Sequence, residues 1–343
     1  MKKIIFIVIL FTLLSLGLRG VYRHKLTLWT DELHQLRAMN KQFKNVLKYN
    51  LYGDHTSFVG EYLLTYPFVK MNNKGYGDAE VGKFNKWIIN IPHILINIIL
   101  FYFLFRLSQI YFKTWVGWAV CWSLFCFNTS LVHHAFEFRP YAVLPFLALA
   151  SLYFCKRVQY YNKWQKGLTG LFFFATINFH AFGILIFLLP CLYVMLNNEK
   201  FYLKPWKFFL ITFLISFPVW CYYAKFNTFG VTPNYAQSIR PTFQYLPNPM
   251  LDPVKFIVTV YSVLIGHPAC SFFMTGSLLP LALFGKKKDT WFLFLFVFLP
   301  ITLILLVDIK TQYWFIQRQW VWVIPFFHIY MGKIWDRFAE RIT

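Results

Sequence analysis

The chain has 343 residues, of which 58% are hydrophobic, 22% are aromatic and only 14% are charged. A soluble domain carries about 25% charged residues, so this composition excludes a water-soluble globular protein. Lys and Arg number 34 against 13 Asp and Glu, but the basic residues form no stripe that can be separated from the apolar runs. We therefore expect no nucleic-acid partner.

Apolar runs of membrane-spanning length recur along the chain and predict an all-α polytopic membrane protein, with residues 1–343 forming a single transmembrane domain. The first run follows Lys2 and Lys3 like a secretory signal. It lacks a small-x-small cleavage site, so we expect an uncleaved span. The ten predicted spans are residues 4–18, 87–105, 115–132, 141–155, 167–178, 181–196, 208–224, 266–285, 291–307 and 319–335.

Two of these predictions leave alternatives open. The fifth and sixth spans are joined only by Asn178-Phe179-His180, so they form either a tight hairpin or one bent re-entrant pair. The apolar stretch 254–284 is too long for one untilted span. We favour an interfacial helix over residues 253–265 followed by a single span.

The distribution of basic residues predicts the orientation. When the N-terminus is placed in the cytoplasm, most Lys and Arg of the short connections also fall on the cytoplasmic side, among them Lys163 and the run 286–288. The positive-inside rule then predicts that both termini are cytoplasmic.

This orientation places a long first loop, residues 19–86, on the external face. Thr30 is a candidate helix cap, with Asp31 and Glu32 in the first turn. Apolar residues then recur at helical spacing as far as Leu47, with basic residues between them, and a second such stretch runs over 58–71. We expect two amphipathic helices at the membrane surface, in contact with membrane lipids.

Several ionisable residues fall on the same external face. Asp31 and Glu32 can act as helix-capping residues only, or Asp31 can serve as a general base. Glu137 and Arg139 form either a local ion pair or part of an anion site, because ionisable groups beside apolar spans usually face the bundle interior. Arg318 either anchors the last span at the interface or, with Arg240, binds an anion.

Five short motifs are distributed over most of the length of the chain. Their order resembles that of motifs in the GT-C class of polytopic glycosyltransferases. Bacterial relatives of protein O-mannosyltransferases and of the lipid A aminoarabinose transferase are the nearest parallels. The motifs are Leu28-Trp29-Thr30-Asp31-Glu32, Asp54-His55-Thr56-Ser57-Phe58, Gly77-Asp78-Ala79-Glu80, Phe136-Glu137-Phe138-Arg139-Pro140-Tyr141 and Arg318-Gln319-Trp320. The family's His-Pro-Pro pattern reads His55-Thr56-Ser57 here.

The resemblance implies an inverting transfer of a sugar from a polyprenyl-phosphate donor to a glycan, lipid or protein acceptor. Asp31 would act as the base, with Glu32 orienting the acceptor or supporting the helix start. Together with the other polar residues of the external face, the residues predicted to bind the donor and its phosphate are Glu137, Arg139, Tyr141, Arg240, Arg318, His55 and His134. No nucleotide-binding motif is visible, which suits a lipid-linked donor.

Other functions remain open. A transporter or flippase of lipid-linked glycans would use the same cations to bind a phosphate without chemistry, although no internal repeat is visible. An O-acyltransferase could be built on His133 or His134. A divalent metal ion could in principle be held by Asp31, Glu32, His55, His134 and Glu137, but their spacing is too scattered to predict a site.

Overall fold

The computed structural model describes residues 2–25, 27–28, 30–41, 43–44, 58–72, 78–197, 205–227, 253–266, 286–311 and 320–342. These residues form helices and the connections between them, and no strand occurs in the described part of the chain. The prediction of an all-helical protein is confirmed to this extent.

Four helical stretches are long and apolar enough to cross a membrane, judged by length and composition. They are α1 (Lys2–Lys25), α6 (Ile91–Tyr111), the stretch Pro140–Tyr160, and Pro205–Ala224 within α12 (Pro205–Asn227). The stretch Pro140–Tyr160 comprises η2 (Pro140–Ala142), α9 (Leu144–Arg157) and η3 (Val158–Tyr160). Two shorter apolar helices, α7 (Trp115–Phe127) and α11 (Gly183–Asn197), accompany them. Such helices indicate a membrane protein, and the full set of ten spans stays a prediction.

Most other predicted spans also coincide with helices. α10 (Lys163–Phe179) and α11 are separate helices that pack against each other, which favours the hairpin over one bent pair. The run 291–307 lies in α16 (Lys287–Leu293), the π-type stretch η7 (Phe294–Phe298) and α17 (Leu299–Thr311), and the last span lies in α18 (Ile324–Ile342). The predicted span 266–285 lies outside the described residues except for Gly266.

The third predicted span is divided because Asn128 interrupts it. Asn128 ends α7 and caps the short helix α8 (Thr129–His133), since its side-chain oxygen accepts a hydrogen bond from the backbone N–H of Leu131 at 2.9 Å. Asparagine competes in this way with the helical backbone, so α7 spans 13 residues instead of continuing as one helix.

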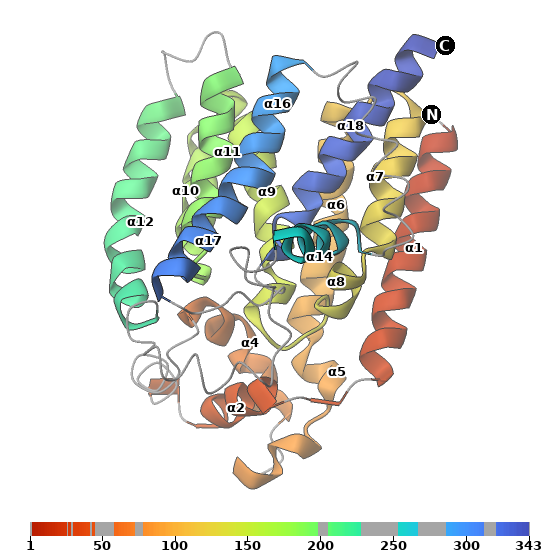
Figure 1. The fold of residues 1–343 in the computed structure, drawn as a ribbon. Helices are drawn as coiled ribbons and strands as arrows, with labels where there is room; N and C mark the ends of the chain where they lie inside the picture. The colour runs from red at the N-terminus through yellow and green to blue at the C-terminus, as the bar shows by residue number, and fades with distance from the viewer. Residues whose placement is uncertain are drawn as a thin grey trace. The chain divides into compact units, whose positions relative to one another are not determined.

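The chain divides into two compact units. The first unit contains residues 1–22, 100–134 and 233–343, and the second contains residues 23–99 and 135–232. Figure 1 shows the helices of both units.

In the first unit, α7 and α18 pack closely. Gly117 and Gly332 make this approach possible: a Cβ atom on Gly332 would lie 2.8 Å from the Gly117 carbonyl oxygen. At the end of this contact, buried Asp336 accepts hydrogen bonds from the backbone N–H groups of Lys113 and Thr114 at the start of α7. The helix α14 (Pro253–Ile265), in the region predicted to hold an interfacial helix, lies crosswise to α18 (Figure 1).

In the second unit, helices α9 to α12 pack around a core of apolar side chains from α9, α10, α11 and α12. The helices of the predicted first loop, α2 (Thr30–Met39), α4 (Val59–Asn72), η1 (Asp78–Lys83) and α5 (Lys86–Ile89), form a second cluster. Leu36 and Met39 on α2 are fully buried in this cluster, together with Tyr62 and Val69 of α4 and Phe138. The apolar face of α2 therefore packs on protein and not on lipid. The predicted continuation of this helix towards Leu47 lies largely outside the described residues.

Candidate functional site

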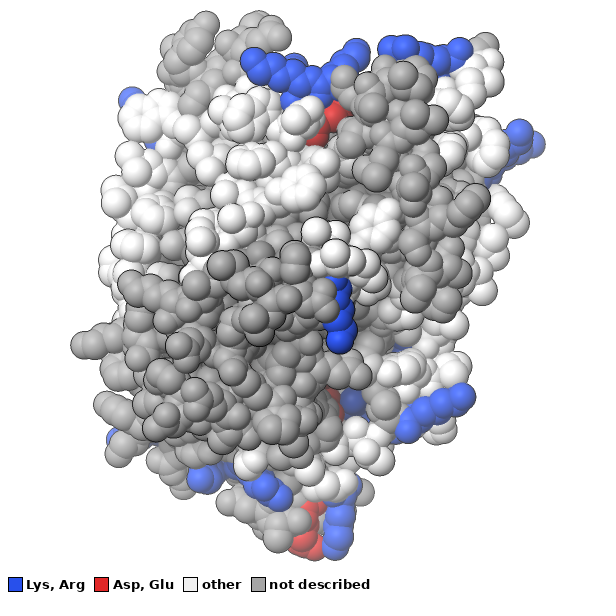
Figure 2. All heavy atoms as spheres, in the orientation of Figure 1, with Lys and Arg blue, Asp and Glu red and all other residues white. Residues whose placement is uncertain are grey.

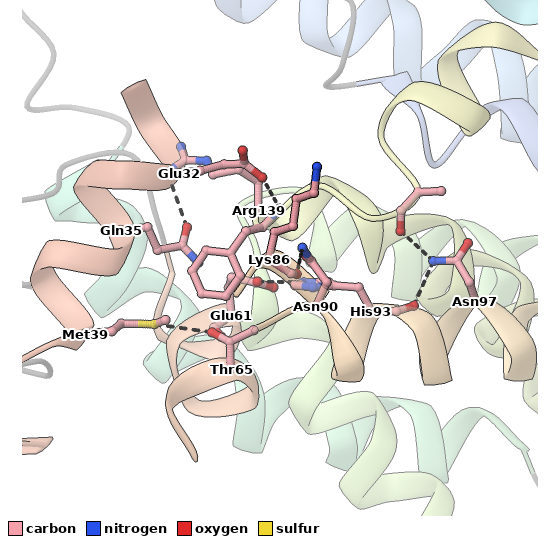
Figure 3. A network of polar contacts seen from close by, with 12 residues as sticks. Glu32, Gln35, Met39, Glu61, Thr65, Lys86, Asn90, His93, Asn97 and Arg139 are labelled. Carbon is pink, nitrogen blue, oxygen red and sulfur yellow. Dashed lines mark hydrogen bonds and ion pairs between the residues drawn. The ribbon is translucent and has the colours of Figure 1, made fainter. Parts of the chain in front are cut away.

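Glu32 belongs to a network of polar contacts in the second unit (Figure 3). Arg23, in the last turn of α1, places its Nη2 atom 3.1 Å from Glu32 Oε1 and donates a 3.4 Å hydrogen bond from Nη1 to Oε2. The backbone N–H of Phe138 donates to Glu32 Oε1 at 2.7 Å. Because the Glu32 side chain is fully buried, these donors replace the water that its carboxylate would otherwise bind. Glu32 thus joins the end of α1 and the start of α2 to the segment around Phe138, which lies more than a hundred residues further along the chain.

Arg139 lies directly after the residue that Glu32 holds. Its Nη1 atom donates to Gln35 Oε1 on α2 at 3.5 Å (Figure 3), and its backbone is extended where it precedes the helical turn η2. Glu137 and Arg139 are 6% and 5% exposed, and the backbone N–H of Arg139 donates to the Glu137 carbonyl oxygen at 2.8 Å. The structure therefore brings Glu32, Glu137 and Arg139 together in one buried region.

Tyr141 extends this region towards a group of aromatic side chains. Its ring packs edge-to-face on His180, with the ring centres 5.7 Å apart. His180 also lies 6.4 Å from the ring of Phe58, which contacts Trp220 and Tyr223 of α12. Tyr141 is thus buried next to a cluster of aromatic side chains. Arg139, two residues earlier, contacts α2 instead.

A second buried acid lies on α4. Glu61 Oε1 is 2.8 Å from His93 Nε2 of α6, and both side chains are fully buried (Figure 3). The ring of His93 packs edge-to-face on Phe138, with the ring centres 6.0 Å apart. Four residues further along α6, Asn97 donates to the carbonyl oxygen of Ala135 at 2.7 Å. The segment that carries Glu137 and Arg139 is therefore held by α2 from one side and by α6 from another.

The sequence did not single out Glu61, His93 or Asn97 as candidate site residues, although a signal was present. Asn90, His93 and Asn97 recur at helical spacing, so they line one face of α6 and its start, inside a predicted apolar span. All three are buried, with exposures of 0%, 0% and 1%. Polar residues inside an apolar span face the protein interior and mark functional positions more often than chance.

The remaining predicted residues are not all placed. Asp31 lies in the first turn of α2, but its side chain is outside the described part of the structure, as are His55, Arg240 and Arg318. His134 belongs to the first unit, where it ends α8 and packs on His133, whose Nδ1 atom is 2.5 Å from the Tyr22 hydroxyl.

A metal site is not formed by the described residues, among which no three His, Cys, Asp or Glu side chains lie close enough together to hold an ion. Two of the residues considered for a metal, Asp31 and His55, have no described side chain.

No family model matches the chain, and neither does any curated protein or solved structure with which it was compared. The resemblance to the GT-C class therefore depends on the order of the motifs alone.

Proposed function

We propose that the protein is a membrane glycosyltransferase that moves a sugar from a polyprenyl-phosphate donor to an acceptor on the external face of a bacterial inner membrane. The observation that supports this proposal is a contact between two of the motifs that resemble the GT-C class, the one that ends at Glu32 and the one that contains Phe138 and Arg139. Glu32 of the first motif binds the backbone N–H of Phe138 at 2.7 Å, and the next residue, Arg139, contacts Gln35 of the same helix as Glu32. Residues more than a hundred positions apart are thus held in one buried region.

The chemistry follows from this grouping. Asp31 would remove a proton from the acceptor hydroxyl or amine while that group attacks the anomeric carbon, and the bond from that carbon to the phosphate oxygen would break. The polyprenyl phosphate leaves with its electron pair, so cations must stabilise the charge that develops on it. A single displacement of this kind inverts the anomeric configuration.

The buried charges assign different tasks to the two acids of α2. Both oxygens of Glu32 accept from Arg23 or from the backbone of Phe138, which suits a residue that positions its neighbours. Asp31, the adjacent residue in the first turn, is the base in this proposal. Glu32 offsets the charge of Arg23, so Arg23 cannot contribute its full charge to the donor phosphate, and we expect the phosphate to require Arg240 or Arg318 as well as Arg139.

The test is donor turnover by the whole protein in lipid nanodiscs. Undecaprenyl-phosphate-linked glucose, mannose and aminoarabinose are offered together with a membrane extract as the source of acceptor. We expect one of these donors to yield free undecaprenyl phosphate and a glycosylated product of inverted anomeric configuration. Release of no undecaprenyl phosphate from any donor would contradict the proposal.

The Glu61–His93 pair favours a second candidate, a transporter or flippase of lipid-linked glycans. Buried acid–histidine pairs in membrane proteins often carry protons that drive transport. A transporter would move the intact lipid-linked sugar across sealed vesicles without releasing its phosphate, so the same donors separate the two functions.

A further inference from the structure

Five basic residues gather around one acid in the first unit. Lys286, Lys287 and Lys288 precede or begin α16, while Lys333 and Arg337 lie one turn apart on α18. Asp289 is fully buried between the two helices: its carboxylate forms an ion pair with Lys333 at 2.5 Å and another with Arg337. We call the five basic residues the cationic cluster.

The cationic cluster has more positive charge than the neighbouring acids can offset. Asp289 of α16 carries one negative charge. The two acids of α18 have other partners: Asp336 binds the start of α7, and Glu340 lies 3.1 Å from Lys113 Nζ. Lys286 and Lys288 also lie close enough to act electrostatically on Lys333. Like charges held this closely repel one another, so a bound anion would stabilise the arrangement.

The basic side chains of the cationic cluster differ in their exposure. Lys286, Lys287 and Lys288 are exposed, whereas Lys333 and Arg337 are 13% and 19% exposed and are anchored by Asp289. Figure 2 shows Lys and Arg side chains gathered along the upper edge of the view, where Figure 1 places the start of α16 and the end of α18. An anion bound here would meet the three exposed lysines and the two basic side chains that Asp289 anchors.

An apolar strip continues from the cationic cluster along the same helical run. Trp291 packs edge-to-face on Phe294, with the ring centres 5.9 Å apart, and Phe294 and Phe298 are 45% and 54% exposed. Tryptophan is enriched at the level of lipid head groups, and exposed Phe beyond it suits contact with acyl chains. A phospholipid has a charged head group followed by apolar acyl chains. A basic cluster followed by an apolar surface is therefore complementary to an anionic phospholipid.

We propose that the cationic cluster is a binding site for a phosphate-bearing anion, supplied by the head group of an anionic phospholipid whose acyl chain lies along Phe294 and Phe298. Lysines would contribute as point charges, and the Arg337 guanidinium would orient the phosphate oxygens. This site is separate from the residues assigned to sugar transfer, and its existence does not depend on that function.

The test is a titration of the delipidated full-length protein, in neutral detergent, with phosphatidylglycerol, phosphatidylcholine or inorganic phosphate, followed by native mass spectrometry. The variant Lys286→Gln/Lys287→Gln/Lys288→Gln removes three charges from the cationic cluster. The control Lys163→Gln/Lys166→Gln/Lys207→Gln removes three charges from the second unit, on the side of the membrane expected to be the same. Both variants are checked for unchanged thermal unfolding.

We expect phosphatidylglycerol to bind the wild type and the control with equal affinity, and the cluster variant roughly 10- to 100-fold more weakly, because each lysine near a head group adds to the attraction. Phosphatidylcholine should bind all three proteins alike. Equal loss in the cluster variant and the control would overturn the proposal, since it would show a general charge effect. Displacement of phosphatidylglycerol by millimolar inorganic phosphate would support the anion site and overturn the lipid as its source.

Discussion

Burial decides what the ion pair between Arg23 and Glu32 contributes to stability. Its 3.1 Å N–O distance equals that between Lys113 and Glu340, but the first pair is 4% and 0% exposed and the second is 80% and 32% exposed. Solvent screens the second pair and not the first. The same separation therefore has different energetic consequences at the two places.

We expect Glu32→Gln to lower the free energy of unfolding by about 2–4 kcal/mol, because it leaves the buried Arg23 without a counter-charge. The matched variant Glu340→Gln should change it by less than about 1 kcal/mol. Thermal and denaturant unfolding of both variants in the same detergent measures the difference. Equal effects would show that burial of the Arg23–Glu32 pair has no special role in stabilising the protein.

Arg139 is expected to bind the donor phosphate through paired N–H groups that lysine cannot reproduce. Arg139→Lys should therefore weaken binding of undecaprenyl phosphate roughly 10-fold. Arg157→Lys, at an exposed position of the same unit, is the control and should leave the affinity unchanged. Unaltered affinity in Arg139→Lys would remove Arg139 from the phosphate site.

From the sequence, Glu32, Glu137 and Arg139 were predicted to lie on the same external face of the membrane, because each is close to the external end of a predicted span. The sequence could not predict the partners of these residues. Arg23 lies at the end of an apolar span, where a basic residue normally indicates only orientation, and its pairing with Glu32 depends on the turn between α1 and α2. Glu61 was hidden for a similar reason, since its partner His93 lies on another helix.

At the scale of elements, the packing of α7 on α18 depends on two glycines. A Cβ atom on Gly332 would lie 2.7 Å from the Phe112 ring and 2.8 Å from both the Cys121 Cβ and the Gly117 carbonyl oxygen. Backbone atoms cannot move aside as the end of a flexible side chain can. Small residues at such contacts let helices approach closely where lipid provides no hydrophobic drive.

Gly332→Ala should consequently destabilise the protein by about 1–3 kcal/mol through overpacking. Gly20→Ala on α1 is the control, since no atom lies within 4 Å of its Cβ position and alanine favours the helix. Thermal unfolding of the two variants gives the comparison. A Gly332→Ala protein as stable as the Gly20→Ala protein would contradict the close packing of α7 and α18.

Helix positions were predictable from apolar runs, but helix ends and faces were less so. The break at Asn128 was missed because asparagine in an apolar run does not reveal which backbone group it will bind. The amphipathic pattern of α2 predicted a face on the membrane, whereas Leu36 and Met39 pack on α4 and Phe138. An apolar stripe indicates that a face is buried, and only tertiary packing determines what covers it.

At the scale of the whole molecule, the distribution of Lys and Arg predicts that Lys163 and Lys287 are cytoplasmic while Lys44 and Arg240 are external. Single cysteines at these four positions, in a background without the six native cysteines, should label from opposite sides of sealed vesicles. Labelling of positions 44 and 163 from the same side would refute both the topology and an external site.

Asp31 is the proposed base of the sugar transfer. Asp31→Asn keeps the shape of the side chain and removes its proton acceptor, and the most direct test measures donor turnover and thermal stability on one preparation of this variant in nanodiscs. We predict stability within about 1 kcal/mol of the wild type, since only the interaction with the helix dipole changes, and turnover reduced at least roughly 100-fold. Near-normal turnover in a folded Asp31→Asn protein would contradict the account.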